Sequence, residues 1–416
     1  MDNVSTGCPY HAGAVAKEFE PYNLKNPFPF YKKAREEEPV FYNEELDYWV
    51  VTRHEDIKAI FTDWKTFTSE NAQSPLQTLD PRAKKIMDDA GMIGLSGLSG
   101  RIPPDHTRIR RIVGMGFNIS RFKKLEPQIR ELAKKQIDAF KNDGQAEIVK
   151  QLAYDLPALV IFMLLGVPAE DVAKVKDWAV SRLMITWGDL TAEEQIYHAE
   201  NIVRYFNYCK NLVKLRHENP TDDLPGDLVR YQLEGNEITD HEIATICYSV
   251  LFAGHETTTT LIGNSVRELL LHRESWERIC QDPKLISKAV EEVLRYSPSI
   301  VAWRRKSTED AVIGGIKIPK NSNLLLVMGS GNRDETVFEE GESFQIDRNG
   351  ARNHLSFGYG IHFCIGSALA KLEAKIVLEE LTAAIPQLQL KKGQDFEFAP
   401  NTSFRAPVAV EVEWEV

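Results

Sequence analysis

Helical periodicity dominates residues 106–297, where apolar side chains recur at spacings of three and four. The strand-like apolar segments lie outside this stretch, at 40–42, 48–52, 313–318 and 324–328, and at the alternating residues Val408, Val410, Val412 and Trp414. So long a helical part excludes an alternating βαβ chain. The pattern predicts a mainly α fold with small β-sheets at its two ends.

No repeat, low-complexity tract or Pro/Gly/Ser linker divides the 416 residues, although that length allows two or three domains of about 150 residues. The first 26 residues have an irregular pattern, a helix is expected at 27–38, and the two apolar segments that follow it predict a hairpin. Residues 72–104 are rich in Gly, Ser, Pro and Asp, which predicts a long functional loop. We therefore expect one mainly α domain with β additions.

Charge and cysteine usage limit the possible partners and compartment. The 50 Lys and Arg against 61 Asp and Glu give a net charge of −11, which argues against nucleic acid or an anionic membrane as the main partner. The longest apolar run, 158–167, is too short to span a bilayer, and no secretory signal is visible, so we expect a cytoplasmic protein. The cysteines are odd in number and scattered, which is typical of a reducing compartment: Cys8, Cys209, Cys247, Cys280 and Cys364.

Residues 357–370 read Phe-Gly-Tyr-Gly-Ile-His-Phe-Cys-Ile-Gly-Ser-Ala-Leu-Ala. Cys364 ends a glycine-rich turn and precedes an apolar-patterned helix, so its sulfur would lie at a helix N-terminus, where free N–H groups favour thiolate. Glycines at 358, 360 and 366 would let a flat macrocycle lie close to the backbone. A thiolate held in this way suits the axial position of haem iron. The simpler alternative is a small buried Cys beside a tight turn.

This segment resembles the haem-binding loop of the cytochrome P450 family, and further motifs follow in that family's order. Residues 253–257 (Ala-Gly-His-Glu-Thr) resemble its oxygen-activating helix, and Glu292 with Arg295 resembles its ExxR motif. The stretch 106–110 resembles its His-x-x-x-Arg propionate motif. Asn332, Arg333 and Asp334, with Phe338 and Phe344, resemble its meander segment.

The resemblance implies a single-domain cytochrome P450 fold over residues 1–416 that encloses haem b between a central and a proximal helix. It makes Cys364 the axial thiolate and Glu292 with Arg295 a structural support beneath the haem loop. Taken alone, an i,i+3 pair on an exposed helix is worth only a few tenths of a kcal/mol. The implied haem contacts are His106, Arg110, Arg305 and His362 toward the propionates, and Phe357, Gly358, Gly366 and Ala253 against the macrocycle.

Glu256 and Thr257 lie among apolar neighbours in a run of four threonines, 257–260. The hydroxyls could simply bond to carbonyls one turn back, which we expect for two or three of them. A carboxylate in a buried helix is costly, so a function is the better explanation for Glu256. The resemblance assigns proton delivery to this pair, with Thr257 hydrogen-bonded to dioxygen and Glu256 relaying protons from water.

The function implied is that of a haem-thiolate monooxygenase, which activates dioxygen with electrons from a redox partner to hydroxylate or O/N-dealkylate a small apolar or aromatic substrate. By family analogy, the pocket is formed by residues 72–100, 181–187, 300–303 and 402–404 and by the face of the central helix near Val250 and Ala253. The named pocket residues are Val250, Ile300, Val301 and Phe404. Two alternatives stay open: a peroxide-driven peroxygenase, and a non-enzymatic haem sensor or carrier. The first does not need Glu256 and Thr257, and the second needs neither them nor an enclosed pocket.

Residues 101–135 hold ten Arg and Lys and three acids, a local charge of +7 in an acidic chain. This face could be merely solvated, or it could dock an acidic electron donor such as a ferredoxin or a flavodoxin-like domain. The C-terminal half, including residues 400–405, resembles P450 haem domains that are fused to an FMN/iron–sulfur reductase. The chain is therefore expected to be either such a haem domain or a stand-alone relative with separate partners.

Overall fold

The computed structural model describes residues 13–92 and 95–416. The predicted irregular segment at 1–26 is therefore described only from residue 13, where it contains the 3-10 turn Ala16–Glu18. Cys8 lies outside the described residues, as do positions 93–94 of the predicted loop. Among the described residues, no helix is both long enough and apolar enough to cross a membrane.

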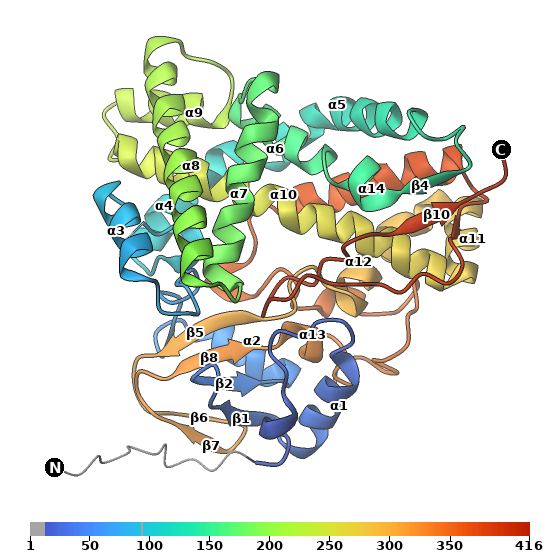
Figure 1. Ribbon diagram of the computed structural model, residues 1–416, viewed down its shortest axis with the longest axis horizontal. Coiled ribbons are helices and arrows are strands. Elements are labelled where there is room, and N and C mark those ends of the chain that lie inside the picture. Colours follow the sequence, from blue (N-terminus) through green and yellow to red (C-terminus); the bar gives the residue numbers. More distant parts are fainter. Residues whose placement is uncertain (1–12, 93–94) are drawn as a thin grey trace.

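Helices make up most of the fold, and most of them form its upper part in Figure 1. Their bounds are α1 Phe28–Glu37, α2 His54–Thr62, α3 Pro81–Asp89, α4 Asp105–Gly116, α5 Ile119–Asp138, α6 Leu156–Leu165, α7 Val172–Trp187, α8 Ala192–Glu218, α9 Leu224–Leu233, α10 Asp240–Leu271, α11 Arg273–Gln281, α12 Ile286–Tyr296, α13 Met328–Gly331 and α14 Ser367–Ala384. Of these helices, α1, α2 and α13 lie beside the main sheet in the lower part of Figure 1. The mainly α class predicted from the sequence is confirmed.

The central element is α10, which crosses the middle of the molecule and packs against α6, α8 and α14. It begins at a capping box, in which the Thr239 hydroxyl accepts from the Glu242 amide and the Glu242 carboxylate accepts from the Thr239 amide. Its 32 residues span about 48 Å. Because neighbours cover it on nearly every side, most residues between Ile243 and Leu270 are buried.

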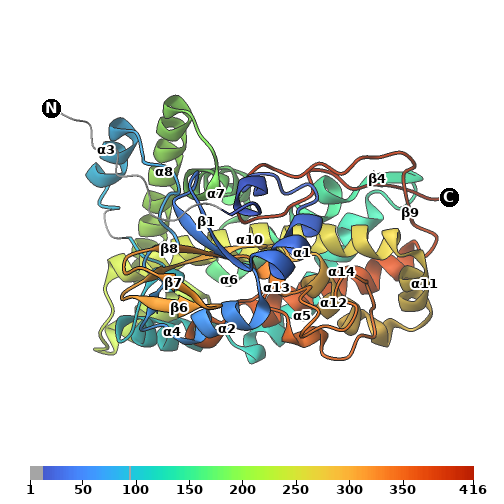
Figure 2. The same ribbon diagram turned by 90° about the horizontal axis from the view of Figure 1, so that it is seen from below.

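The main sheet has the strand order β1-β2-β8-β5-β3 and lies below the helices in Figure 1. Its strands are β1 Val40–Asn43, β2 Tyr48–Val51, β3 Phe67–Thr68, β5 Trp303–Ser307 and β8 Asn323–Leu326. The predicted hairpin β1–β2 is present, and β2 pairs parallel with β8, with Val51 opposite Leu326. Segments from both ends of the chain thus share one sheet. Figure 2 shows this sheet, with α1 and α2, in front of the helical part.

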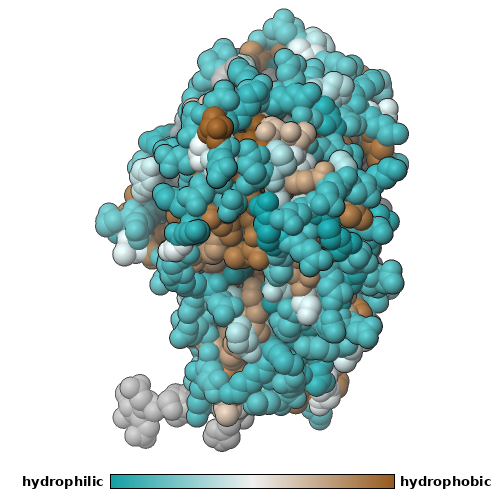
Figure 3. All heavy atoms as spheres, turned by 90° about the vertical axis from the view of Figure 1, so that its right-hand side faces the viewer, coloured by the Kyte–Doolittle hydropathy of each residue, from teal (hydrophilic) through white to brown (hydrophobic). Residues whose placement is uncertain are grey.

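Two smaller sheets complete the strand inventory of the described residues. A three-stranded sheet has the order β4-β10-β9, with β4 Gln145–Glu147, β9 Gln389–Leu390 and β10 Glu411–Glu413. The hairpin of β6 Ala311–Ile313 and β7 Ile316–Ile318 turns through Gly314 and Gly315, both with positive φ. The face that carries the C-terminal strands is mostly hydrophilic, with apolar side chains gathered near its centre (Figure 3).

Several predicted elements need correction. The predicted loop at 72–104 contains α3, which Asp80 caps and Pro81 begins. The predicted helical stretch 106–297 is interrupted by β4, whose partner β10 comes from the far C-terminus. The C-terminal strand is shorter than the alternating residues 408–414 predict, because only Glu411–Glu413 pair with other strands.

Candidate active site

A cavity lies between α10 and α14 and reaches Arg110 of α4, Arg182 of α7 and Arg305 of β5. Its floor is formed by the loop 356–366 and the start of α14, and one of its walls by α10 from Ile246 to Leu261. The cavity is lined mainly by apolar side chains, so a ligand inside it would be largely shielded from water.

Cys364 lines this cavity just before α14 begins. Its amide donates to the Phe357 carbonyl at 2.9 Å, which closes the turn. Gly360 has φ of 68°, and a Cβ there would lie 2.7 Å from the Phe61 carbonyl oxygen, so both the backbone conformation and the space require glycine. Burial raises the pKa of the Cys364 thiol, while the Gly366 amide, Arg110 and the Ser367 amide oppose this rise. The expected lowering by the helix N-terminus is thus present but is outweighed by burial.

Four basic side chains gather beside the loop. His106 is buried, and its ring lies 4.2 Å from that of His362, centroid to centroid. Burial, reinforced by Arg110 and Arg305, lowers the pKa of His106 to about 4 and that of His362 to about 3. Both ring nitrogens of His106 and Nδ1 of His362 have no hydrogen-bond partner among the described residues. The group therefore contains ring nitrogens that are free to donate to or accept from a ligand.

The two arginines of this group have no carboxylate partner in the described part of the chain. Arg305 is fully buried, donates to the Arg304 carbonyl and lies 4.8 Å from the Phe61 ring. Burial lowers its pKa to about 10. Arg110 donates to the Phe363 carbonyl at 2.7 Å. Buried cations without a counter-charge are costly, so this corner is suited to bind two carboxylates of a ligand.

The threonine run of α10 divides into different environments. Thr257 lines the cavity and donates to the Ala253 carbonyl at 2.9 Å, Thr260 donates to the Glu256 carbonyl, and Thr259 donates to the Ala153 carbonyl. The expectation that two or three of these hydroxyls bond one turn back agrees with the two that do. Thr257 is then the hydroxyl that combines this bond with access to the cavity beside Ala253.

Glu256 does not line the cavity and lies behind Thr257. One of its carboxylate oxygens is 2.7 Å from Nε2 of the buried His255. Burial would raise the pKa of Glu256, but His255 and Lys176 hold it below the ordinary value. Glu256 is therefore an ionised carboxylate whose side chain retains partial exposure (20%). Its carboxylate therefore lies toward the outer side of α10 and is not part of the cavity lining.

Glu292 and Arg295 are fully buried on α12 and form a two-fold ion pair at 2.8 and 2.7 Å. Arg295 also donates to the carbonyls of Asn332, Gly341 and Ser343. Glu292 in turn accepts a hydrogen bond from the Gln345 amide at 2.9 Å. This pair therefore ties α12 to the segment that leads into the cysteine loop.

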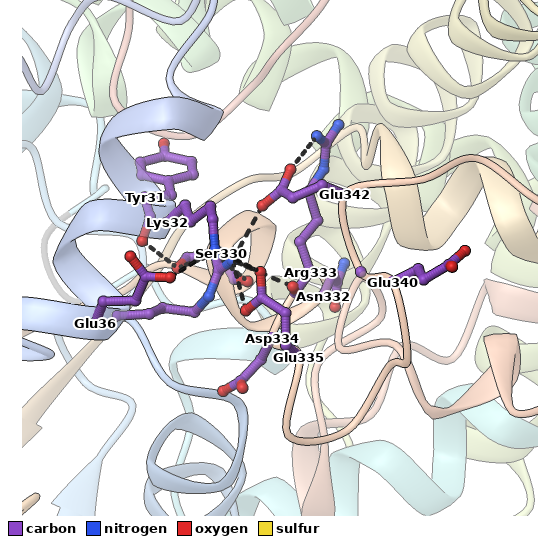
Figure 4. A network of polar contacts seen from close by, with 12 residues as sticks. Tyr31, Lys32, Glu36, Ser330, Asn332, Arg333, Asp334, Glu335, Glu340 and Glu342 are labelled. Carbon is purple, nitrogen blue, oxygen red and sulfur yellow. Dashed lines mark hydrogen bonds and ion pairs between the residues drawn. The ribbon is translucent and has the colours of Figure 1, made fainter.

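The segment 330–342 is tied from the other side by α1 (Figure 4). Arg35 donates to the Ser330 carbonyl at 3.1 Å and pairs with Glu335 and Glu342 at 3.2 and 3.0 Å. Arg333 pairs with the same Glu342 at 2.9 Å. Charged groups from α1, α12 and the meander thus fix the approach to Cys364.

The predicted pocket residues differ in where they lie. Val250, Ile300 and Phe404 line the cavity, but Val301 does not: it is fully buried and its backbone bonds to Ser403 and Gly329. The predicted haem contacts Phe357, Gly358, Gly366 and Ala253 all line it. From the predicted wall segments, the lining residues are Gln73, Leu98, Ser99 and Arg182, together with Trp303.

Ser249 and Glu373 also line the cavity, although no sequence motif predicts a role for either of them. Ser249 lies two turns before Thr257 on α10, and its buried hydroxyl has no partner among the described residues. Glu373 of α14 is buried in the cavity floor, and burial raises its pKa well above the ordinary value. Neither residue belongs to a motif, and no local pattern marks them.

The residues present fit haem. A cysteine sulfur faces a mainly apolar cavity, glycines allow close approach beside it, and unpaired basic groups lie at one edge. Haem needs an iron ligand, apolar walls for its ring and cations for its two propionates. Cys364 could hold the iron, while Arg110, Arg305, His106 and His362 could hold the propionates.

Comparison with known proteins gives concordant results. A family model described as "Cytochrome P450" matches residues 175–385. The "Biotin biosynthesis cytochrome P450" of Bacillus subtilis (strain 168) is 33% identical over 398 residues, which is 94% of this chain and 97% of that protein. The "Vitamin D(3) 25-hydroxylase" of Pseudonocardia autotrophica is 32% identical and covers 89% of each chain.

Two solved structures resemble the fold closely. "Cytochrome P450 CREJ in complex with (4-ethylphenyl) dihydrogen phosphate" is 51% identical with a TM-score of 0.94, covering 96% of this chain and 100% of that one. An "intact type IV self-sufficient cytochrome P450 monooxygenase" is 35% identical with a TM-score of 0.93. That match covers 99% of this chain but 54% of the other, so the neighbour extends well beyond the shared part.

Proposed function

Since this chain belongs to the cytochrome P450 family and is a monooxygenase that binds haem b through a cysteine thiolate, we propose that Cys364 supplies this thiolate and that the cavity is the active site. The observation that carries the proposal is the arrangement around Cys364. Its sulfur faces the cavity from the start of α14, and the amides of Gly366 and Ser367 stabilise its charge.

The floor and edge of the cavity would hold the cofactor. Arg110 and Arg305, with His106 and His362, bind the two propionates, while Gly358 and Gly366 leave room for the ring. When bound, haem supplies the redox chemistry that activates dioxygen, and its thiolate ligand favours cleavage of the O–O bond. Glu292 and Arg295 contribute by holding the loop in place, and they touch neither cofactor nor substrate.

Protons reach the cavity by way of α10. The Thr257 hydroxyl donates its proton to the Ala253 carbonyl at 2.9 Å, and it would turn from this carbonyl into the cavity to donate the same proton to dioxygen. Glu256 acts as the ionised acceptor that takes protons from water on the outer side of the helix, with His255 beside it. The apolar walls, including Val250, Ile300 and Phe404, exclude other water.

The substrate we propose is a small phenyl compound that carries an anionic ester, with phosphate as the first candidate. The solved neighbour at 51% identity holds (4-ethylphenyl) dihydrogen phosphate. In this chain, Phe252, Trp303 and Phe404 line the cavity, and the Phe404 ring lies 6.3 Å from that of Phe252. Aromatic rings at this spacing would pack against a phenyl substrate. Oxidation would be hydroxylation of the ring's alkyl substituent, or O- or N-dealkylation where an alkyl group is joined to the ring through oxygen or nitrogen.

The electron donor we propose is a ferredoxin or an FMN/iron–sulfur reductase, either separate or fused to this domain as in the self-sufficient neighbour. The basic segment 101–135 supports this only in part, because Arg101, Arg108, Arg121, Arg130 and Lys134 are already ion-paired to acids. Within the described part of the chain, the cations of this segment without an ion pair are Arg110, Arg111, Lys123, Lys124 and Lys135. A docking surface would therefore be centred on Lys123 and Lys124 of α5, which are exposed.

Isotope labelling tests the reaction. The protein, a ferredoxin with its reductase, NAD(P)H and 4-ethylphenyl phosphate are incubated under ¹⁸O₂. The proposal expects one labelled oxygen atom in the organic product for each dioxygen consumed. Product formed only with hydrogen peroxide, with no label from ¹⁸O₂, would instead identify a peroxygenase. No product with any donor or with peroxide would support a haem sensor or carrier.

A further inference from the structure

Of the side chains that line the cavity, the charged ones are Arg110, Arg182, Arg305 and Glu373. Burial raises the pKa of Glu373 well above its ordinary value. Its Oε2 has no hydrogen-bond partner among the described residues, and it forms no ion pair with Arg182. The haem propionates would use Arg110 and Arg305. Arg182 therefore remains as a cation without an assigned partner. It comes from α7 and lies on a wall with Ser249 and Phe252 of α10, away from the cysteine loop.

Arg182 is 7% exposed, and its contacts are all with neutral groups. It donates to the Tyr248 carbonyl at 3.2 Å and to the Gln73 side-chain oxygen at 2.8 Å. Its guanidinium lies 4.4 Å from the Tyr248 ring and 4.8 Å from the Phe252 ring. No carboxylate of the described residues lies within ion-pair distance, although a buried charge normally has a counter-charge. An anionic ligand would supply it.

Two hydroxyl groups lie on the same wall. The Ser249 hydroxyl is buried without a hydrogen-bond partner in the described part of the chain and lines the cavity. The Ser99 hydroxyl accepts from the Gln73 amide nitrogen at 2.9 Å, so its own proton is available for a ligand. Gln73 thus links Arg182 to Ser99 through its two hydrogen bonds. Arg182, Ser249 and Ser99 offer N–H and O–H donors on this wall, and no negatively charged group of the described residues accepts from them.

Gly97 lets the main chain approach α10 closely at this corner. A Cβ at position 97 would lie 2.3 Å from the Ser249 hydroxyl oxygen and 3.9 Å from Nη2 of Arg182. Its φ of −68° is accessible to any residue, so the backbone does not require glycine here. The space does, because any side chain would displace the Ser249 hydroxyl. The main chain at Gly97 is thus packed directly against Ser249, next to the cavity wall that carries Arg182 and Ser249.

Helix geometry fixes how far this wall lies from Thr257, the residue proposed to contact dioxygen. Ser249 precedes Thr257 by two turns, roughly 12 Å along α10. Val250 and Ala253 line the cavity between them, and the aromatic side chain of Phe252 lies beside Arg182. A molecule anchored at Arg182 would extend along α10 with its far end toward Thr257.

We infer that Arg182, assisted by Ser249, Ser99 and Gln73, binds the anionic ester group of the substrate and thereby sets both substrate choice and the carbon that is oxidised. This inference rests on the proposed function, because it concerns the same cavity. An arginine can form paired hydrogen bonds with two oxygens of a phosphate, and desolvation strengthens such charge-assisted bonds. Arg182 is therefore a specificity-determining residue, while the chemistry stays with the groups near Cys364.

Binding titrations test the inference without measuring turnover. The haem-loaded full chain is titrated with phenyl phosphate, phenol, phenyl sulfate and benzoate, and the low-to-high-spin change of the absorption spectrum gives the dissociation constant. Arg182→Gln should raise the dissociation constant for phenyl phosphate at least about 30-fold, the loss typical of removing one partner of a buried charge pair. Its effect on phenol should stay within about two-fold, and Ser249→Ala should weaken phosphate binding less than Arg182→Gln does.

Controls separate folding from recognition. Arg204→Gln removes an arginine of α8 whose side chain is 53% exposed and which does not line the cavity, so it should leave all four dissociation constants unchanged. Arg182→Lys keeps the positive charge, and it should restore part of the phosphate affinity. The carbon monoxide spectrum and the melting temperature of each variant report whether it still folds around haem.

The outcomes distinguish this inference from the proposed function. Equal losses for phenyl phosphate and phenol in folded Arg182→Gln would overturn it, as would no preference of the wild type for any anion over phenol. A wild-type preference for phenyl sulfate or benzoate over phenyl phosphate, lost in Arg182→Gln, would uphold the anion site while removing phosphate from the proposed function. Oxidation of phenyl phosphates by an unimpaired Arg182→Gln would leave the proposed function standing and contradict the inference.

Discussion

Glu292 and Arg295 illustrate how burial changes the contribution of an ion pair to the free energy of unfolding. On an exposed helix their i,i+3 spacing would be worth a few tenths of a kcal/mol, but both side chains are fully buried here and bonded to the meander. Removing one charge leaves the other uncompensated, so Glu292→Gln should lower the free energy of unfolding by about 3–5 kcal/mol. Urea denaturation measures this, and the variant should also retain less haem.

Lys85→Gln provides the matched control for that substitution, because the Lys85–Asp89 pair lies on the exposed side of α3. An exposed i,i+4 pair contributes less than about 1 kcal/mol. Equal destabilisation by the two substitutions would show that the buried pair has no special role beneath the cysteine loop.

Glu373 makes the stability of the folded protein depend on pH. Its folded-state pKa is raised by burial above the unfolded value, so the folded protein keeps the proton that the unfolded chain releases. The stability it contributes is therefore complete below the unfolded pKa and is lost as the pH rises above it. Glu373→Gln should melt at a higher temperature relative to wild type at pH 8 than at pH 5. A difference independent of pH would show that the carboxyl ionises freely in the folded protein.

Thr257 can be tested against a neighbour with the same local hydrogen bond. Thr257→Ala should keep haem and consume NAD(P)H, but its product per NAD(P)H should fall at least about tenfold, because positioned proton transfer contributes roughly 10²–10⁴-fold. The missing electrons should appear as hydrogen peroxide. Thr260→Ala removes an equivalent bond to the carbonyl one turn back, but Thr260 does not line the cavity, so coupling should persist. Tight coupling in Thr257→Ala would remove its role in proton delivery.

At the scale of elements, local sequence patterns predicted what local forces determine. The hairpin β1–β2, the helix α1 and the long helical part follow from periodicity and turn residues, and all are present. The helix α3 was missed because its surroundings are rich in loop-forming residues, although Asp80 and Pro81 form a usable start signal. The strand β4 is only three residues long, and its partner lies at the other end of the chain, so no local pattern could reveal it.

The helix α5 carries the prediction about electron entry. Lys123 and Lys124 are exposed and have no ion pair among the described residues, whereas Arg121 and Arg130 of the same helix are paired. Replacing both lysines by Glu should slow reduction by an acidic ferredoxin about tenfold or more at low ionic strength. Stopped-flow reduction measures the rate, and the two proteins should converge as salt screens the charges.

The exposed face of another helix supplies the control for that experiment. Lys84 and Lys85 of α3 are also exposed, and their replacement by Glu changes the net charge equally. If this pair of substitutions slowed reduction as much as the pair on α5, net charge rather than a docking surface would control the rate.

At the scale of the whole molecule, the fold unites segments that the sequence keeps apart. The main sheet joins strands near residues 40–68 with strands near 303–326, so the two predicted β additions are one layer with shared register. The sequence predicted small sheets at the two ends but not that their strands pair with one another, since pairing between strands so far apart leaves no signal in a local window. The alternation of apolar and other side chains predicted the strands but not which strands pair with each other.

The candidate site shows the same division between motif and tertiary structure. The loop around Cys364 and the ExxR pair are each contained in one short motif, so both can be recognised in the sequence. Arg182, Ser249 and Gln73 come from three segments and meet only in the folded chain. Their significance depends on a missing counter-charge and an unpartnered hydroxyl, and neither property exists before the chain folds.

The central claim is that Cys364 is the thiolate ligand of haem, and the absorption spectrum of the reduced protein under carbon monoxide tests it most directly. The wild type should show the red-shifted Soret band of thiolate ligation. Cys280→Ser, which changes a half-buried cysteine outside the cavity, should keep this band, and Cys364→Ser should lose it. An unshifted band in the wild type, or a red-shifted band that persists in Cys364→Ser, would contradict the account.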